Sequence, residues 1–421
     1  MEYKKIDLGS YKLHLVKTNK FKSILFKIIF RDEIKKDEIT IRNMLIDNLV
    51  SSCYSYPSKK EVSIKKQDLY GASVYGENKR VGNHILTELS MSILNPKYTE
   101  DGMLEESISF FKDIILNPNV KDGVFDIKNF NIIKENNIND IKSLFENSNR
   151  YALTKLKESM SLDYAFSFRS CGYLSDIDKI TPKSLYDYYL KVLKTNYIDF
   201  YIVGDIDFKQ IENLIKNNFV FPTFKKKKED ILIKYEGRKK EQVIIEDSSF
   251  NQSVLAIGCY FNNLTDKERN YALILYNIIF GNSPDSKLFK VVREENSLAY
   301  SISSIFKRTD DLLIINAGLS YSNYDKAISL IKQEIKAMNK GDFALEDLDK
   351  AKELVLSVLK DIFDYQDSIV DYYFTLEYVD SDDISKKEEE FKSITKKDII
   401  DVSKKLKIDT IYLLKEKVDE K

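Results

Sequence analysis

The sequence repeats one pattern of elements in its two halves, and this repeat limits the possible folds more than any other feature. The first half closes with a helical run that Thr181 opens, followed by an apolar strand over residues 198–204. The second half closes in the same way, with a helical run that Thr395 opens and a strand over residues 408–414. In both cases the Thr is a typical N-cap and a short β-rich strand ends the unit. A repeat this long predicts two related domains.

Earlier elements of the two halves correspond as well. A helix over residues 40–51, with apolar residues spaced as on a buried helical face, has a counterpart over residues 270–280. Strands and then long helices follow in each half; the strands are expected at 72–75, 84–92, 299–305 and 312–317, and the helices at 105–115, 183–193, 325–338 and 345–363. This order predicts an α+β fold of two homologous domains, each an antiparallel sheet with helices packed on it.

The break between the halves is expected at a charged linker. Pro222 and the lysine-rich stretch that follows it separate two apolar regions, and such a change in composition is typical of a linker. The sequence therefore predicts an N-terminal domain over residues 1–221, a linker over 222–240 and a C-terminal domain over 241–421. The length of 421 residues agrees with this division, because it is too long for one hydrophobic core.

Charge and hydropathy argue against several classes of protein. Lys and Arg (66) nearly balance Asp and Glu (67), so composition gives no reason to expect binding to nucleic acid or an anionic membrane. No segment has the ~18 to 20 apolar residues of a membrane helix, and the first residues do not resemble a signal sequence, so a cytoplasmic location is expected. The three cysteines, Cys53, Cys171 and Cys259, are too widely spaced for a zinc knuckle and do not form a disulfide framework.

Two stretches carry a resemblance to a known family. Residues 286–301, SKLFKVVREENSLAYS, resemble the LF-x-x-VRE-x-x-x-LAYS signature of the insulinase/pitrilysin zinc metallopeptidases. Residues 57–63 and 69–73 resemble the segment that follows the zinc-binding helix of that family. The length is similar to that of the short, processing-peptidase-like branch, in which two such chains face each other as a clamshell. More narrowly, the chain resembles a bacterial non-catalytic subgroup associated with elongation factor P modification.

The resemblance implies that the zinc site has been lost. Active members carry H-x-x-E-H on the first long helix, where two His one turn apart share a Zn²⁺ and the Glu activates its bound water. Here the motif falls on Met44, Asp47 and Asn48, and the third ligand position falls near Glu135. A thioether and a neutral amide are poor zinc ligands, and Asp47 would have no metal-bound water to activate. We therefore expect no metal and no cofactor.

The histidines of the chain cannot restore this site. The sequence contains only His14 and His84, far apart, and neither has a His or Cys partner at helical spacing. A structural role is expected for each. Motifs of serine hydrolases, phosphate-binding loops and dinucleotide-binding folds are also missing from the sequence. A hydrolase with an unrecognised site, such as a Cys–His pair formed in space, remains an alternative.

The C-terminal signature is intact where the zinc motif is not. In active relatives its Arg and Tyr bind the substrate carbonyl and the developing oxyanion, and the resemblance assigns these roles to Arg293 and Tyr300. Because this chain keeps only that part of the site, we expect it to complement a zinc-bearing paralogue in a heterodimer. The structural alternative is that Arg293 pairs with an acid and Tyr300 is strand core.

Peptide or protein binding is expected at a sheet edge. The resemblance places the edge strand beside the degenerate zinc helix, at Gly71, Ala72, Ser73, Val74 and Tyr75. A peptide can add to such an edge through its main chain, and Gly71 and Gly76 would allow a close approach. An ordinary hairpin turn explains these glycines nearly as well. A rival function is a homodimeric binding or scaffold protein with no role in proteolysis.

Overall fold

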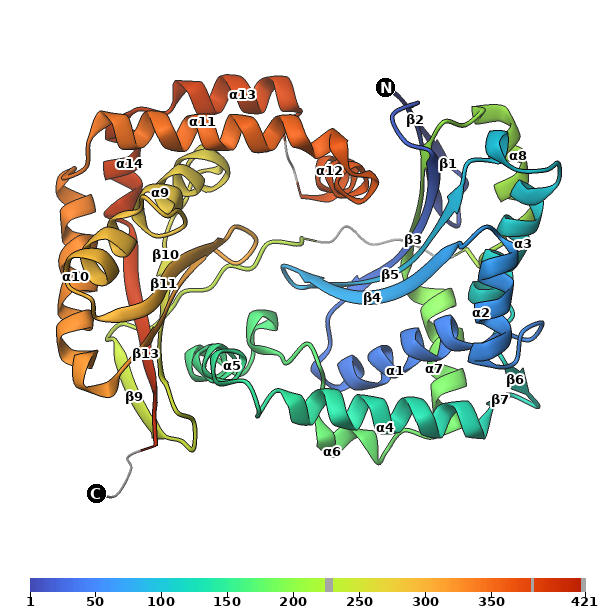
Figure 1. The fold of residues 1–421 in the computed structure, drawn as a ribbon, viewed down its shortest axis with the longest axis horizontal. Helices are drawn as coiled ribbons and strands as arrows, with labels where there is room; N and C mark the ends of the chain where they lie inside the picture. Colours follow the sequence, from blue (N-terminus) through green and yellow to red (C-terminus); the bar gives the residue numbers. More distant parts are fainter. Residues whose placement is uncertain (224–229, 380–381, 418–421) are drawn as a thin grey trace. The chain divides into compact units, whose positions relative to one another are not determined.

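The computed structural model describes residues 1–223, 230–379 and 382–417. Contacts within the chain divide it into two units (Figure 1). Unit 1 comprises Met1–Lys142, Arg169–Asp230 and Phe363–Tyr373, and unit 2 comprises Ser143–Phe168, Ile231–Ile362 and Phe374–Lys421. Each unit contains one mainly antiparallel sheet and its own set of helices, so the predicted α+β fold of two homologous domains is confirmed.

The sheet of unit 1 has six strands in the order β1-β2-β8-β3-β5-β4. Only the β2–β8 pair is parallel. Every residue of β8 is buried, which explains why its sequence is apolar apart from Asp199. The strands are β1 (Glu2–Asp7), β2 (Lys12–Lys17), β3 (Ser23–Glu33), β4 (Ser73–Val81), β5 (His84–Leu94) and β8 (Tyr197–Gly204).

Helices cover this sheet and form one core with it. They are α1 (Ile39–Ser51), α2 (Lys59–Asp68), α3 (Met103–Leu116), α4 (Ile127–Ser143), α7 (Pro182–Thr195) and α8 (Phe208–Asn218). α7 begins as predicted, because the Thr181 side chain accepts a hydrogen bond from the backbone N–H of Ser184 at 3.1 Å. α1 packs closely on β4, so the degenerate zinc helix lies beside an edge strand.

Unit 2 repeats this arrangement with five strands in the order β11-β12-β10-β13-β9. The β13–β9 pair is parallel and the others are antiparallel, so β13 corresponds to β8 and β9 to β2. The strands are β9 (Gln242–Asp247), β10 (Ser253–Phe261), β11 (Ala299–Lys307), β12 (Leu312–Leu319) and β13 (Leu406–Lys415). The helices that share their core are α9 (Leu273–Phe280), α10 (Tyr324–Lys340), α11 (Leu345–Asp361), α13 (Ile384–Ser393) and α14 (Lys396–Ser403).

Two segments belong to the unit opposite to the one that the sequence order suggests. The helix α5 (Ser148–Met160) lies in unit 2, and the first part of α12 (Gln366–Tyr378) lies in unit 1. α5 packs on β10, where Met160 occupies the space left by the absent side chain of Gly258. In exchange, the Gln366 side chain donates hydrogen bonds to the backbone carbonyls of Ser23 and Val203. The domain boundaries predicted from the sequence, at residues 221 and 241, do not describe this exchange. Sequence order carries no information about which sheet a helix covers.

The segment expected to be a linker is only partly described. Within it, Ile231, Ile233 and Tyr235 are buried in unit 2, and the Tyr235 hydroxyl donates to Asp409 at 2.9 Å. This part of the segment predicted as a linker is packed structure. The run Lys225–Lys228 lies outside the described residues. Among the helices that are described, none has the length and apolar character needed to cross a membrane.

Candidate functional site

The zinc-motif positions lie on the buried face of α1. Met44 is fully buried in the core of unit 1. Asn48 is also buried, and its amide donates back to the Met44 carbonyl at 2.8 Å. At the two predicted ligand positions, one side chain therefore packs in the core and the other makes a local hydrogen bond.

Polar residues of α4 face this part of α1. The Asn137 amide donates to the Asp47 carboxylate at 2.8 Å, and the Asn129 amide donates to the Asn48 carbonyl oxygen at 3.2 Å. Asn129 also donates to the Ser51 hydroxyl at 2.7 Å. Burial raises the pKa of the Asp47 carboxyl above its usual range, while the hydrogen bond from Asn137 opposes this shift. A network of amides and hydroxyls with one carboxylate thus fills the place expected for a zinc site.

Glu135 does not take part in this network. It is exposed on α4, whereas Asn137 lies two residues further on and is buried. Asn137 belongs to the buried stripe of α4, together with Phe130, Ile133 and Ile141. Its helical spacing was a signal that could have identified it in the sequence. The third position is therefore better placed on the Asn residues of α4 than at Glu135.

The remaining histidines have structural partners. His14 is buried in unit 1, where its Nε2 lies 3.1 Å from Asp199 and its Nδ1 lies 2.8 Å from the Tyr3 hydroxyl. His84 begins β5 and contacts the Asn83 side chain. Over the described ranges, no group of three or more His, Cys, Asp or Glu residues could hold a metal ion. The described cysteines are free; Cys53 and Cys259 are buried, and burial raises their thiol pKa values.

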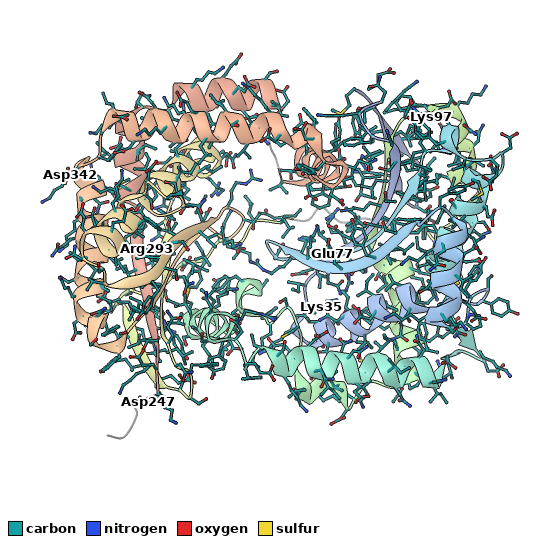
Figure 2. All side chains as sticks on the ribbon, in the orientation of Figure 1. Lys35, Glu77, Lys97, Asp247, Arg293 and Asp342 are labelled. Carbon is teal, nitrogen blue, oxygen red and sulfur yellow. The ribbon has the colours of Figure 1, made fainter. Side chains whose placement is uncertain are left out.

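Arg293 and Tyr300 both point away from the core of unit 2. Arg293 lies on a wide helical turn, Phe289–Glu295, and its guanidinium stacks over the Phe289 ring at 4.6 Å (Figure 2). Tyr300 follows on the edge strand β11, where 67% of its surface is exposed. The structural alternative is wrong for Tyr300, which is not core. For Arg293, no ion pair is found among the residues that the structure describes.

The apolar residues of the same signature hold these two side chains in place. Leu288, Val292, Leu298 and Ala299 are all buried in the core of unit 2. The backbone N–H of Leu298 bonds to the Val292 carbonyl at 3.0 Å, which closes the turn between helix and strand. The signature therefore presents an arginine and a tyrosine on a rigid support.

The proposed peptide edge is an edge strand in the structure. β4 lies at the end of its sheet and pairs only with β5 among the described strands. The residues leading into it turn sharply, with Gly71 at a φ of 75°. Glycine is required at position 76 for a different reason, because a Cβ there would lie 2.4 Å from Ile46 of α1. The two glycines are thus explained by a turn and by helix packing, and they do not themselves indicate a peptide site.

Comparison with known proteins shows a similarity to inactive peptidase homologues. The family model described as "Peptidase M16 inactive domain" matches residues 179–355. Along 97% of its length the chain is 27% identical to a Bacillus subtilis (strain 168) protein named "Probable inactive metalloprotease YmfF", covering 96% of that protein. The chain is thus similar to an inactive M16 peptidase domain over residues 179–355 and to YmfF over nearly its whole length.

Two further matches concern the fold and a possible relative. A crystal structure of a conserved protein from Enterococcus faecalis V583 superposes with a TM-score of 0.92, at 24% identity and with all of both chains covered. An 88-residue stretch, 20% of this chain and 22% of the other, is 31% identical to "Uncharacterized zinc protease YmxG" of Bacillus subtilis (strain 168). Both the matching family model and YmfF are described as inactive, so the chain is similar to non-catalytic M16 peptidase homologues.

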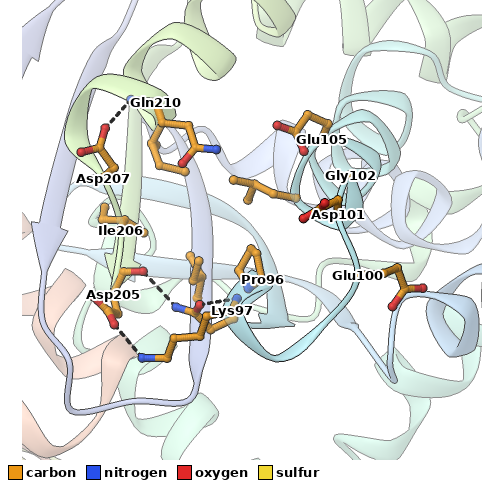
Figure 3. Close-up of a pocket in the computed structure, with 14 residues that line it drawn as sticks. Pro96, Lys97, Glu100, Asp101, Gly102, Glu105, Asp205, Ile206, Asp207 and Gln210 are labelled. Atoms are coloured by element: carbon orange, nitrogen blue, oxygen red, sulfur yellow. Dashed lines mark hydrogen bonds and ion pairs between the residues drawn. The ribbon is translucent and has the colours of Figure 1, made fainter.

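A hollow of about 440 Å³ in unit 1 is rich in carboxylates (Figure 3). It lies between the loop before α3 and the start of α8. Asp205 pairs with Lys97 at 2.6 Å, and Asp207 accepts a hydrogen bond from the backbone of Gln210 as the N-cap of α8. Glu100 accepts a hydrogen bond from the Tyr70 hydroxyl. These carboxylates have local structural partners, so the hollow does not indicate a site.

Proposed function

We propose that this chain is the non-catalytic subunit of a heterodimeric zinc peptidase, in which a zinc-bearing paralogue supplies the metal. The match to YmfF supports the inactive role, and the partial match to a protein named as a zinc protease supports the existence of such a paralogue. Both relatives come from the same bacterium, so one organism contains both kinds of chain.

The observation that carries the proposal is the exposure of Arg293 and Tyr300 on a rigid support. A buried Tyr300 or a paired Arg293 would need no further explanation. Instead, both lie at the surface, and the buried residues around them belong to the same signature. Exposed polar side chains that are held in place by buried neighbours are typical of residues that contact a ligand.

The chemistry of peptide hydrolysis gives these residues a role. A zinc ion in the partner would supply an activated water for peptide hydrolysis, and negative charge would then develop on the substrate carbonyl oxygen. A guanidinium and a phenol held in fixed positions would donate hydrogen bonds to that oxygen and lower the barrier. In this proposal Arg293 and Tyr300 act on the substrate in the partner's site, while the partner provides the nucleophile.

Binding of the substrate main chain at β4 is a second part of the proposal. Residues 71–75 lead into this edge strand, whose outer side has no strand partner in the described structure. A peptide added there would be recognised mainly through backbone hydrogen bonds, with little dependence on its sequence. The association with elongation factor P modification and the cytoplasmic location remain predictions.

The test is cleavage of an unstructured peptide by the zinc-bearing paralogue, with and without this chain. Adding the chain should raise kcat strongly, and Arg293→Ala should reduce kcat of the assembled complex by about 10²- to 10³-fold, the usual effect of losing one oxyanion donor. Tyr300→Phe should reduce it in the same direction. Complex formation by each variant is measured separately by size-exclusion chromatography.

Lys307→Ala is the matched control, since Lys307 is an exposed cation at the other end of β11. It should leave kcat unchanged. If both Arg293→Ala and Tyr300→Phe complexes assemble and retain full activity, the assignment of these residues is wrong. If the two chains neither associate nor cooperate, the homodimeric scaffold becomes the better function.

A further inference from the structure

A second hollow, of about 380 Å³, lies within unit 2 between α9, α11 and α13. Its wall is almost entirely apolar and is formed by Ile274, Ile278, Leu354, Val355, Val358, Leu359 and Phe391. Leu354 and Val358 are also exposed to solvent, at 45% and 57%. The volume falls in the ~300–1,000 Å³ range that is common for small-molecule sites. The hollow is therefore large enough and apolar enough to hold a small organic molecule.

The polar part of this hollow carries positive charge. Arg308, from the turn between β11 and β12, and Lys387, from α13, both line it. The Arg308 guanidinium donates to the Asn270 side chain at 3.1 Å, and the described residues place no carboxylate within ion-pair distance of it. An arginine has five N–H donors, so most of its hydrogen-bonding capacity is left for water or a ligand.

The neighbouring Arg269, unlike Arg308, is paired with a carboxylate. Arg269 makes two hydrogen bonds to the carboxylate of Asp311, at 2.7 and 2.9 Å. The hairpin turn thus provides an acid for Arg269, while the more apolar surroundings of Arg308 provide only an amide. Partly burying a charge without a counter-ion is unfavourable unless a ligand offsets it.

The partly buried, apolar surroundings of Arg308 and Lys387 lower the pKa of both groups. Burial lowers the pKa of Arg308; Tyr271 opposes this shift, and the charge of Arg269 adds to it. Burial, together with the charge of Arg308, lowers the pKa of Lys387 to about 8, although Asp382 and Asp383 oppose the shift. A bound anion would relieve the unfavourable charge on Arg308.

We propose that this hollow binds a small amphipathic carboxylate, with an alkyl or aryl body against the apolar wall and its carboxylate on Arg308. The planar guanidinium can donate two parallel hydrogen bonds to a carboxylate, and a low-polarity setting strengthens them. Lys387 adds positive potential at the same end. This site is independent of Arg293 and Tyr300 and requires no second chain.

Calorimetric titration of the full chain with sodium octanoate and with 1-octanol tests the proposal. Octanoate should saturate a single site, and 1-octanol, which has the same alkyl chain without the charge, should bind at least about tenfold more weakly. Equal affinity for the two ligands would show that binding is apolar only and does not depend on the carboxylate, which would overturn the proposal. Octanoate binding that does not saturate would also overturn it.

Two variants locate the binding. Arg308→Gln should weaken octanoate binding by about tenfold or more, whereas Lys392→Gln, an exposed lysine of α13 that pairs with Glu388, should leave it unchanged. Thermal unfolding of each variant shows whether it folds. If Arg308→Gln does not fold, Val358→Trp provides a second test, because the sequence contains no tryptophan. Octanoate should shift the emission of that lone indole to shorter wavelength, and an unchanged spectrum at saturating octanoate would overturn the proposal.

Discussion

At the scale of single residues, the positions predicted to correspond to a zinc motif are occupied by side chains with structural functions of their own. Met44 fills the core, and Asn48 and Asp47 bond to α1 and to the amides of α4. Such a network is satisfied without a metal. The loss therefore involves more than two missing histidines, because the facing helix also presents Asn129 and Asn137 where a metal would need a charged ligand.

This arrangement predicts how a zinc site could be restored. Met44→His with Asn48→His supplies two ligands one helical turn apart, and Asn129→Glu supplies the third, because Asn129 already lies 3.2 Å from Asn48. The triple variant should retain about one Zn²⁺ per chain after dialysis, measured by elemental analysis. The double variant, which keeps the native Glu135, should retain far less, since Glu135 is exposed on α4. Equal zinc in the two variants would contradict the placement of Asn129.

At the scale of elements, the sequence predicted most helices and strands because their apolar spacing is regular. The helix at 40–51 and the strands that end each half agree with α1, β8 and β13. The loss of a zinc motif was predicted from residue types alone, and it stays a prediction. The Asn residues of α4 that bond to α1 could not be predicted from the sequence, because the two helices are distant in sequence. The role of a polar residue on a buried stripe becomes clear only when its neighbour in space is known.

The packing of α1 on β4 gives a prediction about the proposed peptide edge. Gly76→Ala places a methyl group 2.4 Å from Ile46 Cγ1 and should lower the free energy of unfolding by about 1 to 3 kcal/mol, as is usual for an overpacked contact. Chemical denaturation measures this change.

Ile46→Ala provides the control, because it removes the atoms that the new methyl group would meet. The loss in the double variant should be smaller than the sum of the two single losses. Strict additivity would mean that the glycine is needed for another reason.

At the scale of the whole molecule, the exchange of α5 and α12 makes the two halves of the sequence depend on each other. Unit 1 includes Asp367, which pairs with the buried Lys27 at 2.5 Å, and Lys27 also pairs with Glu88 at 3.1 Å. Although burial opposes its charge, these carboxylates hold the pKa of Lys27 above its usual range. Removing the last part of the chain would leave this buried cation with one partner fewer.

Separately expressed halves should therefore fail to fold alone. Residues 1–223 lack the helix that covers Lys27, and residues 230–421 lack α5. Each fragment should show no cooperative thermal unfolding by circular dichroism, and co-expression should give a 1:1 complex on size-exclusion chromatography. A fragment 1–223 that melts cooperatively at the temperature of the full chain would show that the exchanged helix contributes little.

The same exchange fixes when unit 1 can be completed on the ribosome. Lys27 emerges early, while Asp367 is synthesised more than three quarters of the way along the chain. At about 5 to 20 residues per second, the interval between them is roughly 20 to 70 seconds. During that time the nascent first sheet lacks its last helix and exposes the surface beneath it. Although it is made first, the N-terminal half can complete its unit only after most of the chain has been synthesised.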